Sequence, residues 1–140
     1  MLNRGFTLIE VLVSLVILMF GLLGIAGLMA KGQKASFEAY QRQAALSMAA
    51  DMVERINLNR TQSEAYVASA ATSTPVGDGT KYKNGALAGK CSAACDGTQL
   101  KDYDIALWDG LLQGYGERNA GGATVGGIVN ARGCIDQVAN

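Results

Sequence analysis

The N-terminal part of the chain is a continuous apolar stretch that becomes amphipathic. Residues 6–29 (FTLIEVLVSLVILMFGLLGIAGLM) carry a single ionisable side chain, Glu10, and a helix of this length crosses the ~30 Å hydrocarbon core of a bilayer. Over residues 30–60 apolar side chains recur at steps of three and four, opposed by polar ones, which is the period of an amphipathic helix. The pattern therefore predicts a transmembrane helix over 6–29 and an amphipathic extension over 30–60, together one helix of roughly fifty residues.

The apolar stripe of this extension predicts a packing surface, because such spacing usually marks contact with a protein core. Asn57 and Asn59 are expected to mark the end of the helix, since Asn favours caps and turns. We expect the stripe to pack on a small antiparallel sheet formed by the residues that follow, which predicts an α+β fold. The stripe consists of Ala45, Met48, Ala49, Met52, Val53 and Ile56.

Residues 61–140 have the pattern of one small domain with little regular structure. The stretch 66–90 contains several glycines and Pro75, the only proline, which predicts a long connecting loop. A short helix is predicted over 104–112, with Gly114 as its stop signal. Trp108 on this helix is expected to anchor the core. The apolar face of the helix is predicted to consist of Leu107, Trp108, Leu111 and Leu112.

A hairpin is predicted near the C-terminus. Residues 123–125 and 128–129 are short apolar runs on either side of Gly126-Gly127. A double glycine supplies the positive φ angles that a two-residue turn needs. No Lys-Ser/Thr pair and no strand-to-helix context follows, so the glycines do not indicate a phosphate-binding loop.

The overall composition excludes several classes of function. Twelve basic and twelve acidic residues cancel, so there is no net field to attract nucleic acid, and we expect no direct nucleic-acid binding. The chain has no histidine, which removes the commonest general base, the commonest zinc ligand and every Ser-His or Cys-His pair. We therefore expect a protein that is not an enzyme and has no catalytic residue, metal or cofactor.

Three cysteines lie beyond the apolar stretch, at Cys91, Cys95 and Cys134. Either Cys91 and Cys95 form a local bridge, or one of them pairs with Cys134 and closes a loop of roughly forty residues. Both alternatives are structural disulfides. The spacing lacks the repeated ligand pairs of a zinc site and the C-x-x-C motif of a redox site.

The apolar stretch itself allows two interpretations. A cleavable secretory signal would be cut near residues 24–26 (GIA), a small-x-small pattern. However, the run exceeds the ~7–15 residues of a signal core and holds a carboxylate, whose burial in lipid is costly without a partner. Cleavage after Gly5 would place an α-amino group on Phe6, about one helical turn from Glu10. That amine is largely protonated below a pKa of ~7.7–8.0, and it pairs most naturally with Glu10 of a staggered neighbour.

Residues 4–10 (RGFTLIE) and the apolar stretch after them resemble the cleavage and methylation motif of type IV prepilins. The resemblance implies a leader peptide over 1–5, cleavage between Gly5 and Phe6 by a prepilin peptidase, and N-methylation of Phe6. It implies that Glu10 guides docking into the growing filament. It further implies a single pass through the bacterial inner membrane, in contact with its lipid, a periplasmic domain over 61–140, and later incorporation into the pilus.

Segments further along the chain resemble the PilV-like minor pilins. The likeness is carried by residues 21–28 (GLLGIAGL), 104–112 (DIALWDGLL), the glycine-rich hairpin and 132–135 (RGCI). It implies a subunit that joins other minor pilins and the major pilin in a priming complex beneath a tip adhesin. Such a subunit supports adhesion, twitching motility or DNA uptake. Members of that family normally continue into further strands and another cysteine, so we expect a shortened C-terminus and an incomplete sheet here.

Two other classes share the N-terminal features. A pseudopilin of a type II secretion system would have the same leader and differ in its partners. A membrane-anchored periplasmic binding module would need an exposed basic or aromatic patch. The candidates for such a patch are Lys81, Tyr82, Lys83 and Lys90.

Overall fold

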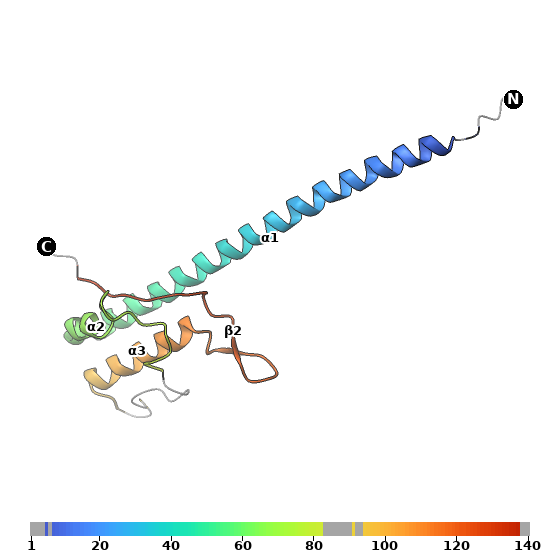
Figure 1. Cartoon of the computed structure of the whole chain (residues 1–140). Helices are drawn as coiled ribbons and strands as arrows, with labels where there is room; N and C mark the ends of the chain where they lie inside the picture. The colour runs from blue at the N-terminus through green and yellow to red at the C-terminus, as the bar shows by residue number, and fades with distance from the viewer. Residues whose placement is uncertain (1–4, 6, 83–90, 92–93, 138–140) are drawn as a thin grey trace. The chain divides into compact units, whose positions relative to one another are not determined.

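The computed structural model describes residues 5, 7–82, 91 and 94–137 (Figure 1). The chain divides into two compact units, residues 1–40 and residues 41–140, called here the N-terminal and C-terminal units. The elements in chain order are α1 (Leu8–Leu58), the 3₁₀ turn η1 (Arg60–Gln62), α2 (Ser63–Ser69), α3 (Gly97–Leu112), β1 (Glu117–Arg118) and β2 (Thr124–Val125).

Helix α1 confirms the prediction of one long helix. It has 51 residues and ends at Leu58, between the two asparagines that were expected to stop it. Its most apolar part, near the N-terminus, has a mean hydropathy of 2.7, and none of that part is buried inside the structure. By length and composition, α1 is able to cross a membrane.

The core of the C-terminal unit forms where the amphipathic end of α1 meets α2 and α3. Its buried members are Met52, Tyr66, Ala70, Val76, Ile105, Trp108 and Leu112, and Met48 and Ile56 of the predicted stripe pack against them. The stripe therefore contacts helices and the loop around Val76. The expectation that it packs on a sheet is wrong, because α2 and α3 supply the apolar surface that a sheet was expected to supply.

The sheet is minimal in the part of the chain that the structure describes. Strands β1 and β2 pair antiparallel, with Glu117 opposite Val125 and Arg118 opposite Thr124. An isolated antiparallel bridge joins Val76 to Gly133. The sheet of the predicted α+β class is therefore reduced, in the described residues, to two strands of two residues each and one bridge.

Helix α3 begins earlier than predicted and ends as predicted. A capping box starts it: the Asp96 carboxylate accepts from the Gln99 N–H, and the Gln99 side chain accepts from the Asp96 N–H. This reciprocal pair satisfies two amides that a helix start leaves without partners, so the seven residues 97–103 (GTQLKDY), most of them polar, become helical. At the other end Gly114 adopts a φ of +75°. The N–H groups of Gly114 and Tyr115 donate to the carbonyls of Leu111 and Gly110, which is a Schellman C-cap.

The buried face of α3 differs from the predicted one. Leu107 and Leu111 are half-buried, whereas Ile105 is buried together with Asp104 and Asp109. Trp108 is 7% exposed and belongs to the core, as expected. The apolar pattern alone missed this face because two of its buried members are acids.

The predicted loop and hairpin also need correction. Helix α2 extends through Ser69, so the irregular segment begins at residue 70, and residues 83–90 lie outside the described residues. The hairpin turn lies at residues 119–123, where the Asn119 side chain accepts from the N–H groups of Gly121 and Ala123. Gly126 and Gly127 follow β2. Gly127 instead lies against Gln113, whose carbonyl carbon is 2.6 Å from where a Cβ would stand.

Candidate functional site

The first turn of α1 holds the predicted docking residue. The Thr7 carbonyl accepts from the N–H groups of Glu10 (3.1 Å) and Val11 (3.4 Å), which places Glu10 in the first turn of a helix that begins at Leu8. The Glu10 side chain is exposed, and no described residue forms an ion pair with it. Gly5 is also exposed, whereas Phe6 lies outside the described residues.

Glu10 differs from Ser14, the other polar side chain of residues 8–29. The Ser14 hydroxyl donates to the Glu10 backbone carbonyl over 2.7 Å, a bond within the helix that satisfies the hydroxyl even in lipid. Among the described residues of 8–29, the Glu10 carboxylate is therefore the polar side-chain group without a partner. A carboxylate in that position requires a cation from outside this part of the chain.

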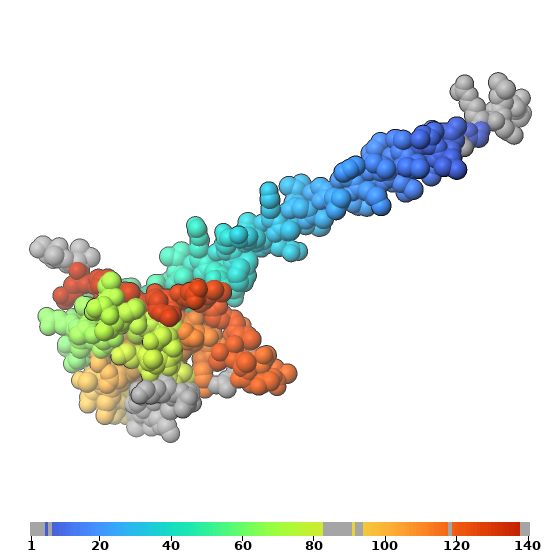
Figure 2. Space-filling view, in the orientation of Figure 1, coloured from blue at the N-terminus to red at the C-terminus, as the bar shows by residue number. Residues whose placement is uncertain are grey.

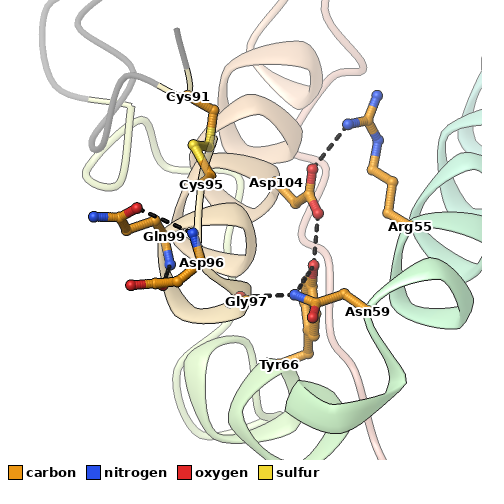
Figure 3. The surroundings of a disulfide bond; sticks show 9 residues. All are labelled: Arg55, Asn59, Tyr66, Cys91, Cys95, Asp96, Gly97, Gln99 and Asp104. Carbon is orange, nitrogen blue, oxygen red and sulfur yellow. Dashed lines mark hydrogen bonds and ion pairs between the residues drawn. A yellow bond between two sulfur atoms is a disulfide. The ribbon is translucent and has the colours of Figure 1, made fainter. Parts of the chain in front are cut away.

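A polar network connects α1, α2 and α3 inside the C-terminal unit (Figure 3). Asp104, 2% exposed, accepts from the Arg55 guanidinium over 2.9 Å and from the Tyr66 hydroxyl over 2.5 Å. The Asn59 amide donates to the Gly97 carbonyl over 2.7 Å. Burial, and then the hydrogen bond to Asp104, raise the pKa of Tyr66 to about 12. The network fixes the end of α1 to α3 because every buried charge in it has a partner.

Asp109, the second buried acid of α3, organises the loop at residues 77–82. It is fully buried, and its two oxygens accept four backbone N–H groups. One oxygen binds Gly77 (2.5 Å) and Gly79 (3.1 Å), and the other binds Lys81 (2.9 Å) and Tyr82 (3.0 Å). A segment without regular secondary structure thereby gains the acceptors that its buried amides need.

These two acids form a structural framework that sequence reasoning missed. Asp104 and Asp109 flank the apolar positions Ile105 and Trp108 in the sequence. Acids adjacent to buried positions on a helix were the available signal, because a buried carboxylate is tolerated only when several donors surround it.

The cysteines form one bridge and leave one thiol. A disulfide joins Cys91 and Cys95 (Figure 3), immediately before the capping box of α3. Cys134 is free and exposed. Within the described residues, no three Cys, Asp or Glu side chains are grouped in a way that could hold a metal ion.

The candidate basic and aromatic patch of the binding-module alternative is not supported at Tyr82. This side chain is 8% exposed, and its ring lies 4.0 Å from that of Tyr115, centroid to centroid. Lys81 is exposed, while Lys83 and Lys90 lie outside the described residues. An aromatic ring buried in this way offers no stacking surface to a ligand.

Comparisons with known protein families match the chain in two stretches. The family described as type IV pilin Tt1218 matches residues 27–106, more than half of the chain. The prokaryotic N-terminal methylation motif matches residues 1–26. No curated protein and no solved structure matches.

Proposed function

We propose that this chain, which belongs to the Tt1218-like type IV pilins, is a minor pilin that primes or promotes pilus assembly. The family is one of structural subunits, so the proposed role is non-enzymatic. The observation that carries the proposal is the Glu10 carboxylate, which has no partner among the described residues, lies on an exposed apolar helix and falls within the stretch that matches the methylation motif.

Processing supplies the partner that Glu10 requires. Cleavage between Gly5 and Phe6 by a prepilin peptidase creates a new α-amino group, which is cationic near neutral pH because its pKa is ~7.7–8.0. N-methylation of Phe6 keeps that charge. In a filament the amine of one subunit pairs with Glu10 of a staggered neighbour, and the cost of holding a carboxylate in lipid falls once the two charges meet.

The same proposal assigns a place to each part of the chain. Residues 1–5 are a cytoplasmic leader, 6–29 cross the inner membrane, 30–60 extend the helix, and 61–140 lie in the periplasm. The disulfide between Cys91 and Cys95 supports the periplasmic location, since disulfides persist in oxidising compartments. Partnership with the major pilin, other minor pilins and a tip adhesin, a PilV-like identity, and roles in adhesion, twitching motility or DNA uptake belong to this proposal.

The test is intact mass and N-terminal sequencing of the chain from native membranes, with and without the prepilin peptidase. We expect a mature chain that begins at methylated Phe6 and that is absent when the peptidase is removed. An uncut chain, or one that begins near Lys31 after a signal-peptide cut, would contradict the proposal.

A pair of variants separates docking from processing. Glu10→Val removes the proposed partner of the neighbour's amine, so we expect normal cleavage but loss from sheared pili. Ser14→Val is the matched control, because Ser14 bonds only within its own helix, and we expect it to be incorporated normally. Equal incorporation of both variants would refute the docking role of Glu10.

A further inference from the structure

Residues 131–136 are an extended segment with one paired edge and one open edge. Gly133 exchanges two hydrogen bonds with Val76, of 2.9 and 3.0 Å. Backbone groups of alternate residues in an extended chain point to opposite edges, so those of Arg132 and Cys134 face away from Val76. Within the described part of the chain, the N–H and C=O groups of these two residues have no hydrogen-bond partner.

The surface beside the open edge is hollowed and apolar. Two adjoining hollows, of about 410 and 230 Å³, share Ala49, Trp108 and Cys134 in their walls. Helix α1 lines one side of both and residues 128–136 line the other, and Figure 2 shows the C-terminal segment in red beside the teal part of α1. Leu46 and Val53 on this side of α1 are 73% and 57% exposed. We call the two hollows together the edge groove.

The side chains of residues 131–136 alternate between the core and the exposed face. Gly133 faces the core, because a Cβ there would stand 2.4 Å from the Trp108 ring. Ile135 packs against the core on the same face. Arg132 and Cys134 are exposed on the other face. The segment therefore has the alternation of a β-strand at the edge of a sheet.

We propose that the edge groove binds an extended segment of a neighbouring, different pilus subunit, which adds as a β-strand beside residues 131–136. The open N–H and C=O groups select a strand, because a helix satisfies its own backbone and would leave them unpaired. The apolar walls select alternate apolar side chains, which lie on Leu46, Ala49 and Val53. The identity of the partner rests on the proposed function, whereas the binding of a strand rests on the groove alone.

The first test uses the full chain in lipid nanodiscs and a synthetic peptide, Lys-Val-Thr-Val-Thr-Val-Lys. Trp108 is the sole tryptophan and lines both hollows, so its fluorescence reports binding directly. We expect a saturable change in emission. Leu46→Asn is expected to weaken binding about tenfold or more. Leu58→Asn is the control, since Leu58 is an exposed apolar residue of α1 that does not line the groove.

Two N-methylated peptides test the backbone pairing. In an antiparallel pair the threonine N–H groups face the protein and the valine N–H groups face away. Methylation of the threonine amides is therefore expected to abolish binding, and methylation of the valine amides to leave it intact. Equal binding of both methylated peptides, or equal effects of Leu46→Asn and Leu58→Asn, would overturn the proposal.

The remaining outcomes concern the occupant. Self-association of the chain that Leu46→Asn abolishes would place a second copy in the groove. Peptide binding by a variant ending at Gln137, but not by the full chain, would place the chain's own last residues there. Either result overturns the choice of partner. In cells, we expect Leu46→Asn to be cleaved before Phe6 but incorporated into pili less than Leu58→Asn. Because cleavage is read separately, failure of the groove and failure of the proposed function are distinguishable.

Discussion

Replacement of Asp109 by Asn keeps the size of this buried side chain but removes half of its acceptors. Each carboxylate oxygen accepts two backbone N–H groups, and the new NH₂ group faces one of these pairs. One buried and one part-buried donor then lose their acceptor, at ~1–3 kcal/mol each, so we expect the free energy of unfolding to fall by ~2–6 kcal/mol. That is a large part of the ~5–15 kcal/mol typical of a domain.

The loop cannot escape this cost simply by detaching. Val76 and Tyr82, at its two ends, are 0% and 8% exposed. Exposing a large apolar side chain costs ~1.5–3 kcal/mol. The destabilisation is therefore expected to reach the whole C-terminal unit.

The assay is urea unfolding of the full chain in micelles, followed by Trp108 fluorescence, since Trp108 lies in the core of the C-terminal unit. We expect a lower midpoint with an unchanged slope, and faster amide exchange at residues 77–82. Glu54→Gln, at an exposed residue of α1, is the control and is expected to change stability by less than ~0.5 kcal/mol. Equal stability of the two variants would refute the stabilising role of the Asp109 hydrogen bonds.

Three further predictions follow from the described contacts. Gly133→Ala is expected to lower the unfolding midpoint by overpacking against Trp108, at ~1–3 kcal/mol, whereas Ala at Gly116, which has open space around it, is not. Tyr66 keeps its proton to about pH 12 in the folded chain and to ~10 when unfolded. Its contribution is therefore full below pH 10 and lost as pH rises from about 10 to 12, and Tyr66→Phe is expected to remove a tyrosinate absorbance transition near pH 12. Iodoacetamide is expected to label Cys134 alone in the unreduced chain and all three cysteines after reduction, and any other pattern would contradict the observed pairing.

The features that sequence reasoning found are those with a local signal. A long apolar run followed by an amphipathic one predicts a continuous helix wherever the rest of the chain lies, and α1 has 51 residues. Gly114 was identified as a stop because a helix C-terminus favours glycine with positive φ. The prepilin motif around Glu10 was also identified, because its residues are contiguous in the sequence.

Two features were missed although their signals are local, because a more familiar pattern lay nearby in each case. The start of α3 at Gly97 had a local signal in the capping box of Asp96 and Gln99, but the apolar period begins only later. The turn was assigned to Gly126 because a double glycine is the commoner turn signal, whereas the side chain of Asn119 supplies the turn by accepting two amides.

The sequence by itself determined the membrane-competent helix, the motif that contains Glu10, and a C-terminal unit anchored by Trp108. Each follows from composition or from a period along a few turns of chain. Only the tertiary structure decided that Asp104 and Asp109 are buried, and that residues 131–136 leave one edge open beside α1. Burial of a carboxylate depends on donors that other segments contribute. The open edge depends on which segment, here Val76, pairs with the opposite edge of residues 131–136. Neither feature is therefore encoded in any short stretch.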